Sequence, residues 1–339
     1  MTPEPTGATA PAEAARAPSP DTFAGILKKL MALEDNVRKV IVGKEESIRV
    51  AIIPLLCRGH LLLEDVPGTG KTTLAKAIAR SIGGEFKRVQ FTPDLLPLDI
   101  TGSSMFNQKT QEFEFLPGPV FTNILLADEV NRATPRTQSA LLEAMEESQV
   151  TSEGRTHKLA DVFCVLATMN PVEQTGTFPL PETQLDRFFL KVGLGYPSEA
   201  EEVQIFDRQA TSHPIHSLQP VVTLDDVKVM REAVQRVFVH PSVKEYCARL
   251  ARATRSHQDV VLGASPRGTL CLIRAAQAMA MLSAKPFVTP DHVKKMAGAV
   301  LGHRIILKPQ AQLRGVTDAM VLREVISRVE IPVNVDQHV

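Results

Sequence analysis

Residues 61–74 read LLLEDVPGTGKTTL and combine an apolar run, a glycine-containing loop, a Lys71-Thr72 pair and the start of a helical segment. Two glycines, Gly68 and Gly70, allow the backbone to wrap closely around phosphate oxygens, and the new helix presents free N–H groups to them. Lys71 can reach the outer phosphates, and the Thr72 hydroxyl can bind Mg²⁺. A plain glycine-rich turn is the alternative, but the complete order of strand, loop, Lys-Thr and helix favours a phosphate-binding loop.

The loop departs from the strict phosphate-loop pattern at its first position. The pattern G-x-x-x-x-G-K-T would place glycine at position 65, where this chain has Asp65. We therefore expect that the backbone at the start of the loop accommodates a side chain.

Short apolar runs alternate with helical segments around this loop. The run at 60–65 is too short and too uniformly apolar to be anything but a buried strand. Four similar runs follow, at 88–92, 124–128, 161–168 and 188–192. Helical segments, such as 72–79 and 138–147, lie between several of them. The alternation predicts an α/β fold with a mostly parallel sheet that helices cover on both faces.

Two segments do not fit this alternation. Residues 102–119 contain the period-two run EFEF at 112–115 and end in Pro-Gly-Pro, a pattern that is typical of an antiparallel hairpin. Residues 149–160 carry a Glu153-Gly154 turn between short polar strands and predict a second hairpin. We interpret both hairpins as insertions into the α/β fold.

The chain divides into a tail and two domains. Residues 1–21 are mostly proline, alanine and small polar residues, which predicts a disordered tail. The strands fall within 22–196, and helical signals dominate the remainder, so 197–339 is expected to be an all-helical second domain. Capping patterns mark three helix starts in that second domain, at Thr223, Ser265 and Thr289.

The composition excludes several classes of protein. Basic and acidic residues both number 38, so the net charge gives no global attraction to nucleic acid or to an anionic membrane. The longest apolar runs are less than half of the roughly 18 residues that suggest a membrane span, and the N-terminus lacks the features of a secretory signal. We therefore expect a cytoplasmic protein without a membrane partner. The histidines and cysteines show no metal-ligand spacing, so a metal site built from them is not expected.

Polar side chains follow two of the predicted strands. Asp128 and Glu129 end the apolar run at 124–128, and the carboxyl ends of strands are where open parallel sheets hold ligands. Asp128 can organise Mg²⁺, and Glu129 can polarise the attacking water as a general base. An acidic helix cap is the alternative, and the upstream Lys71 favours the catalytic interpretation. Asn170 follows the next strand and could orient water, although a turn-forming Asn before Pro explains it equally well.

Five separated blocks carry a resemblance to a known family. The blocks VPGTGKTTL, ILLADEVNRA, ALLEAMEE, VLATMNPVEQTGTFPLPETQLDRF and GASPRG, in this order and spacing, resemble the MoxR family of AAA+ ATPases. The likeness extends from about Val40 to the region of His303–Ile305. It implies an αβα nucleotide-binding domain with two hairpin insertions, a small helical lid, and a ring, usually a hexamer, with ATP between neighbouring subunits.

The resemblance also implies roles for residues of the first domain. Lys71 and Thr72 match its phosphate and magnesium residues, and Asp128 matches the acidic residue that shares the magnesium ion. Glu129 matches the second residue of its acidic pair, and Asn170 matches its first sensor. Further residues are implied to bind the nucleotide, namely Val42 and Gly43 at the adenine and Pro67, Gly68, Thr69, Gly70 and Thr73 in the loop. Taken alone, Val42 and Gly43 are only a short apolar run before a turn.

Two arginines match catalytic positions of the family. Arg187 matches the arginine finger, a planar cation that enters the adjacent subunit's site and neutralises charge on the transferred phosphoryl group. A local salt bridge with Asp186 or Glu182 is the alternative. Arg267 matches the second sensor of the lid, and an ordinary surface arginine is the alternative. Two more arginines, Arg132 and Arg136, could face the subunit boundary or simply solvent.

These observations predict a magnesium-dependent ATPase ring that remodels a protein client. The resemblance implies clients with von Willebrand factor A domains and a chaperone role in complex maturation or metal-cofactor insertion. One rival is a nucleic-acid motor, against which the zero net charge and the absence of a basic run with aromatics argue. A second rival is a scaffold that binds ATP without turnover, against which Glu129 argues.

Overall fold

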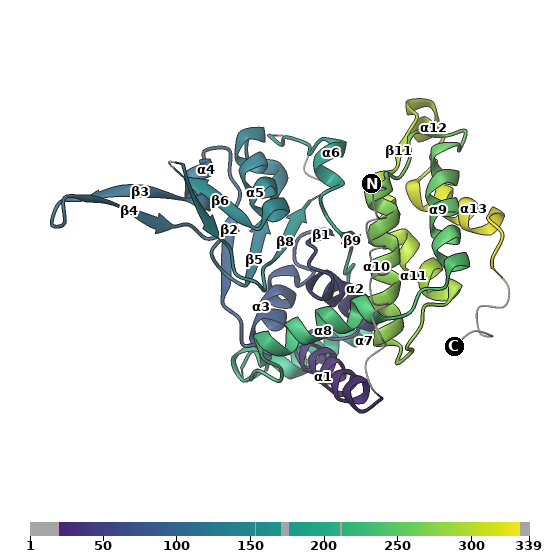
Figure 1. Ribbon diagram of the computed structural model, residues 1–339, viewed down its shortest axis with the longest axis horizontal. Coiled ribbons are helices and arrows are strands. Elements are labelled where there is room, and N and C mark those ends of the chain that lie inside the picture. The colour runs from purple at the N-terminus through teal and green to yellow at the C-terminus, as the bar shows by residue number, and fades with distance from the viewer. Residues whose placement is uncertain (1–19, 153, 171–175, 211, 333–339) are drawn as a thin grey trace, which may run out of the picture.

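The central element of the structure is a five-stranded parallel sheet (Figure 1). The computed structural model describes residues 20–152, 154–170, 176–210 and 212–332. The strands follow the spatial order β2-β5-β8-β1-β9, with β1 at Leu61–Glu64, β2 at Phe86–Gln90, β5 at Ile124–Asp128, β8 at Cys164–Met169 and β9 at Leu190–Val192. All five predicted strands are present. The fourth and fifth start three and two residues later than expected, at Cys164 and Leu190.

Helices cover both faces of the sheet, because successive apolar residues of each strand point to opposite faces. Leu61 and Leu63 belong to a core cluster with α1 (Pro20–Arg38), α2 (Glu45–Leu56) and α3 (Lys71–Ser81). Leu62 belongs to the opposite cluster, with α4 (Pro97–Thr101) and α5 (Pro135–Glu147). The predicted αβα arrangement is therefore confirmed. Because α1 begins at Pro20, the helix includes the last two residues of the predicted tail, and residues 1–19 lie outside the described residues.

Both predicted hairpins are present. The first pairs β3 (Gly102–Asn107) with β4 (Glu112–Pro117) and projects well away from the sheet, at the left of Figure 1. The second pairs β6 (Gln149–Ser152) with β7 (Arg155–Lys158). Its predicted turn includes Glu153, which lies outside the described residues.

The C-terminal region consists mainly of helices (Figure 1). They are α7 (Glu199–Gln209), α8 (Leu224–Arg236), α9 (Pro241–Arg255), α10 (Pro266–Leu282), α11 (Pro290–Leu301), α12 (Pro309–Leu313) and α13 (Asp318–Arg328). Short 3₁₀ turns lie at Val130–Arg132, Pro214–His216 and Gly302–Arg304, and a four-residue helix, α6, spans Glu182–Leu185. Two of the three predicted caps have the expected hydrogen bond: the Asp226 N–H donates to Thr223 Oγ1 at 3.1 Å, and the Gly268 N–H to Ser265 Oγ at 3.2 Å. Thr289 precedes α11 without a side-chain cap hydrogen bond.

One feature of this region differs from the prediction. It is not entirely helical, since β10 (Val260–Leu262) and β11 (Ile306–Leu307) form an antiparallel pair. These runs are too short for a pattern in the sequence to reveal. In addition, α8 packs against α1 and α2, so the apolar core continues without a break across position 197. Among the described residues, none of the helices has both the length and the apolar character that crossing a membrane requires.

Candidate nucleotide site

The glycine loop connects β1 to α3 at the carboxyl edge of the sheet. Gly68 and Gly70 have φ values of 84° and 92°, a left-handed conformation that strains any residue with a side chain. Helix α3 begins at Lys71, so its unpaired N–H groups face the loop. Lys71 Nζ donates to the backbone carbonyls of Asp65 and Val66, at 2.7 and 2.9 Å. The loop therefore has the concave backbone and the cation that bind phosphate.

Asp65 is accommodated because its carboxylate binds backbone groups. Oδ2 accepts hydrogen bonds from the N–H groups of Leu194 and Gly195, both at 2.7 Å, and Oδ1 accepts one from Val66 at 2.9 Å. The residue is 7% exposed. The side chain that breaks the strict pattern thus ties the start of the loop to the segment that follows β9.

The two carboxylates at the end of β5 are held by different partners. Thr168, on the adjacent strand β8, donates its hydroxyl to Asp128 Oδ1 and accepts the Glu129 N–H at 2.8 Å. Arg88 Nη2 lies 2.6 Å from Asp128 Oδ2. Glu129 itself has φ 57°, a left-handed conformation that is costly for a residue with a side chain and is commonly kept at functional positions.

Two side chains fix the Glu129 carboxylate. The Gln90 amide donates to Glu129 Oε2 at 2.7 Å, and Arg132 Nη1 lies 2.9 Å from the same oxygen. The sequence left open whether Arg132 faces the subunit boundary or solvent. In the structure its guanidinium pairs with Glu129. Arg136 is exposed.

One cavity brings most of the predicted phosphate and metal residues together. It has a volume of about 370 Å³ and is lined by Pro67, Gly68, Gly70, Lys71, Thr72, Thr73, Arg88, Asp128, Glu129, Thr168 and Asn170. The Thr72 hydroxyl and the Asp128 carboxylate are both oxygen donors, which Mg²⁺ prefers. The residues in this cavity therefore fit a nucleotide phosphate chain with a magnesium ion.

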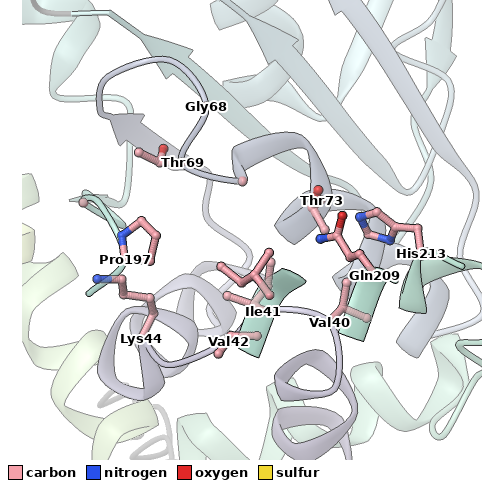
Figure 2. Close-up of a pocket in the computed structure, with 13 residues that line it drawn as sticks. Val40, Ile41, Val42, Lys44, Gly68, Thr69, Thr73, Pro197, Gln209 and His213 are labelled. Atoms are coloured by element: carbon pink, nitrogen blue, oxygen red, sulfur yellow. The ribbon is translucent and has the colours of Figure 1, made fainter. Parts of the chain in front are cut away.

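A second cavity of about 290 Å³ adjoins the first, since Gly68, Gly70 and Thr73 line both. Figure 2 shows its residues, which come from the loop and the start of α3, from the segment before α2, from the segment after β9, and from α7 and the residues that follow it. Its walls are lined by Val40, Ile41, Val42, Lys44, Thr69, Gly195, Pro197, Ile205, Gln209 and His213. The aliphatic side chains of Val40, Ile41, Val42 and Ile205 form part of this lining, and such a surface suits a planar base.

Of the two residues expected at the adenine, Val42 lines this cavity and Gly43 does not. Gly43 has φ 64°, and a Cβ there would lie 1.7 Å from Glu201 Oε1. The positive φ and the nearby Glu201 side chain on α7 therefore favour glycine at this position, and its contact with the base stays a prediction.

The two predicted catalytic arginines line neither cavity. Arg187 Nε lies 3.1 Å from Glu146 Oε2, and Arg267 Nη1 lies 2.9 Å from Glu146 Oε1. The salt bridge considered for Arg187, with Asp186 or Glu182, is not the one observed, because Arg187 pairs with Glu146 and Asp186 pairs with Arg304 at 2.7 Å. The structure thus separates the arginines from the chain's own loop and gathers them on one carboxylate.

Several residues around the cavities were missed by the sequence analysis. Arg88 and Gln90 occupy alternate positions of one strand, a period-two polar pattern that was available as a signal. Their closeness to the acidic pair depends on β2 lying beside β5, which pairs Gln90 with Asp128. Sequence order alone does not give this strand order. Ile205, Gln209 and His213 were missed because they enter the second cavity from a separate helical segment.

The sheet order, the glycine loop and the acidic strand end define a nucleotide-binding ATPase domain of the AAA+ class with a helical lid. The model of the ATPase family associated with various cellular activities (AAA) matches residues 60–190, and that of the AAA lid domain matches residues 252–325. The chain belongs to the MoxR family of AAA+ ATPases, and the resemblance stated from the five sequence blocks is confirmed.

Individual relatives support this assignment over most of the chain. Chaperone MoxR1 of Mycobacterium tuberculosis is 39% identical over 88% of this chain and 81% of its own length. Protein MoxR of Paracoccus denitrificans is 31% identical, with 83% and 89% covered. The protein YeaC of Bacillus subtilis is 50% identical, with 88% and 93% covered. A crystal structure from Cytophaga hutchinsonii superposes with a TM-score of 0.87 at 38% identity, covering 92% of this chain and 97% of that one.

Proposed function

We propose that this chain binds ATP with Mg²⁺ and hydrolyses it within a ring of identical subunits, using the cycle to remodel a protein client. The observation that carries the proposal is the single cavity that Lys71, Thr72, Asp128, Glu129 and Asn170 line together. These residues come from the ends of three different elements, and their side chains supply the cation, the metal ligands, the base and the amide that phosphoryl transfer uses.

Each residue has a distinct proposed role in the cavity. Lys71 and the N–H groups of the glycine loop bind the phosphates, while Thr72 and Asp128 hold the magnesium ion. Bound magnesium would neutralise charge on the phosphate oxygens. Glu129 takes the proton of the attacking water, and Asn170 orients that water. The second cavity receives the base against its apolar wall.

The arginines are proposed to act on a neighbouring subunit. Arg187 and Arg267 line neither cavity of their own chain, yet both are partly exposed, at 32% and 41%. A cation supplied by an adjacent subunit makes hydrolysis depend on assembly. We therefore propose a ring, with six subunits as the expected number, in which both arginines complete the next site.

The proposed client is a protein. The β3–β4 hairpin exposes four large apolar side chains, Met105, Phe106, Phe113 and Leu116. Exposed apolar groups of this kind suit contact with a protein, and a relative carries the name chaperone. A von Willebrand factor A domain, with metal-cofactor insertion as the outcome, is the expected class of client. A nucleic-acid motor is disfavoured by the net charge of zero.

The Glu129→Gln substitution tests the catalytic assignment. The amide keeps the shape of the side chain but cannot accept the proton, so we expect ATP to bind with unchanged affinity and phosphate release to fall by about 100-fold or more. Calorimetry and a steady-state phosphate assay measure the two quantities. Normal turnover in the variant would remove Glu129 from the base role. Wild-type protein that binds ATP but releases no phosphate would favour the scaffold, and release stimulated by DNA with a steep salt dependence would favour the motor.

A further inference from the structure

Glu146 joins the two arginines at their tips. It lies in the last turn of α5 and offers a separate oxygen to each guanidinium, with Oε2 3.1 Å from Arg187 Nε and Oε1 2.9 Å from Arg267 Nη1. The carboxylate is 41% exposed. One accessible carboxylate therefore holds two cations, one from the segment between α6 and β9 and one from the first turn of α10.

A buried ion pair fixes the backbone on which Arg187 sits. The preceding residue, Asp186, accepts a hydrogen bond from Arg304 Nε at 2.7 Å. Arg304 is 1% exposed, and its Nη2 donates to the carbonyl of Phe188 at 2.6 Å. Breaking such a buried pair is costly, because it leaves an uncompensated charge in the interior. The segment that carries Arg187 is thereby held against the C-terminal region.

The same aspartate also reaches the helix that carries Arg267. Ser265 donates its hydroxyl to Asp186 Oδ2 at 2.9 Å and accepts the Gly268 N–H that caps α10. Arg267 lies in the first turn of that helix. The backbones of Arg187 and Arg267 are therefore fixed relative to each other, and only their side-chain tips retain freedom.

A carboxylate between those tips has two physical consequences. It offsets the repulsion between the two guanidinium groups, and it restricts long side chains that otherwise populate many rotamers. The interaction is nevertheless weak, because partly exposed ion pairs contribute little. A phosphoryl group binds arginine more strongly and can replace the carboxylate.

We propose that Glu146 is a positioning residue that holds Arg187 and Arg267 as one pair and yields them to the terminal phosphate of a nucleotide in the neighbouring subunit. This inference rests on the proposed function, in which both arginines act on that neighbour. Orienting the pair before the phosphate arrives lowers the cost of forming the reactive arrangement.

Mixed rings test the proposal. Recipient subunits carry Arg187→Ala, so their nucleotide site is intact. Donor subunits carry Lys71→Ala, so they bind no nucleotide and contribute only their arginines. Hydrolysis in the mixture then requires the donor's arginines. We expect Lys71→Ala donors to restore turnover, and donors that also carry Glu146→Gln to restore about fivefold less at saturating ATP, which corresponds to one weakened charged contact.

Matched controls separate positioning from a general structural effect. Glu143 lies on the same helix and is exposed, so donors with Lys71→Ala and Glu143→Gln should restore as much turnover as Lys71→Ala alone. Because the substitution lies in the donor, the KM for ATP at recipient sites should be unchanged while kcat falls. Donors with Glu146→Asp keep the charge but are too short to reach both arginines, so they should also restore less turnover than Lys71→Ala donors.

The outcomes distinguish a failure of the role proposed for Glu146 from a failure of the site shared between subunits. Equal restoration by donors with and without Glu146→Gln would overturn the role of Glu146 and leave the shared site intact. If the Gln variant does not enter mixed rings, as judged by size-exclusion chromatography, the Asp variant decides by the same comparison. If Lys71→Ala donors restore nothing, the action of the arginines on a neighbouring subunit fails, and the role of Glu146 fails with it.

Discussion

At the scale of single residues, Asp65 shows how a departure from a sequence pattern is compensated. Its carboxylate accepts three backbone N–H groups, and two of them belong to Leu194 and Gly195, which lie some 130 residues further along the chain. Gly195 also lines the second cavity. The side chain therefore connects the start of the phosphate loop to the wall of the proposed base site.

Replacing Asp65 should weaken both the fold and the site. Asp65→Ala leaves three N–H groups without their charged acceptor, so we expect the free energy of unfolding to fall by about 2–4 kcal/mol. ATP affinity should fall as well, because the loop and the cavity wall lose their common anchor. Asp65→Asn keeps one acceptor oxygen and should cause a smaller loss. Urea denaturation and calorimetry measure the two effects, and an unchanged unfolding midpoint in Asp65→Ala would contradict this account.

A second residue-scale prediction concerns Gln90, which donates to Glu129 Oε2 at 2.7 Å. Gln90→Ala removes this contact and leaves the carboxylate less well oriented, so kcat should fall by about tenfold, the equivalent of one hydrogen bond. The dissociation constant for ATP should not change. Gln235→Ala, on an exposed face of α8, is the control and should have normal kinetics. A normal kcat in Gln90→Ala would show that Arg132 orients Glu129 sufficiently.

At the scale of secondary structure, His60 joins three elements around the sheet. It precedes β1, its Nδ1 accepts the N–H of Val165 on β8 at 3.0 Å, and its Nε2 donates to the carbonyl of Met145 on α5 at 2.9 Å. This arrangement requires the neutral ring. Burial lowers the pKa of His60 to about 4, from an ordinary value of 6.5. Burial also lowers the pKa of His303 well below its ordinary value.

The stability of the fold should therefore depend on pH. Since the folded pKa values are depressed, the unfolded chain binds more protons below about pH 6.5, and stability should fall as the pH drops from 6.5 toward 4. Each histidine contributes a slope of about 1.4 kcal/mol per pH unit at most. His60→Gln should reduce the slope, whereas His216→Gln, at an exposed position, should not. Urea denaturation at several pH values would reveal the difference, and identical slopes in both variants would contradict the assignment.

At the scale of the whole molecule, the proposed site is divided between subunits. The cavities of one chain are lined by the loop, the acidic pair and Asn170. Arg187 and Arg267 line neither cavity and instead pair with Glu146. The apolar core that supports the cavities continues into the C-terminal helices. The segment that carries Arg187 is joined to this region through the ion pair of Asp186 with Arg304.

This division predicts that turnover depends on protein concentration. Dilution below the assembly threshold should reduce phosphate release per subunit, because separated chains lack the neighbour's arginines. Arg187→Ala should lower kcat by about 100-fold or more, as expected for a group that stabilises the transferred phosphoryl charge, while ATP affinity stays similar. Activity and sedimentation measured over the same concentration range provide the test. Constant activity per subunit in dilute monomers would refute a shared site.

Local patterns predicted the elements and most of the first cavity. Gly68 and Gly70 mark a loop because the backbone there adopts conformations that glycine favours, and Asp128 and Glu129 end an apolar strand. The carboxyl ends of parallel strands lie at one edge of a sheet, so the sequence alone predicts that Lys71 and the acidic pair lie at the same edge. These features depend on dihedral preferences and on residue spacing, which are local properties of the chain.

Other contacts depended on the packing of distant segments. Asp65 binds residues 194–195, Gln90 reaches Glu129 because β2 lies beside β5, and Glu146 meets two arginines that are 41 and 121 positions away. No spacing in the sequence encodes these distances. They are decided when the apolar faces of the sheet and helices are buried against one another, because burial is non-directional and only the completed core fixes which polar side chains meet at its surface.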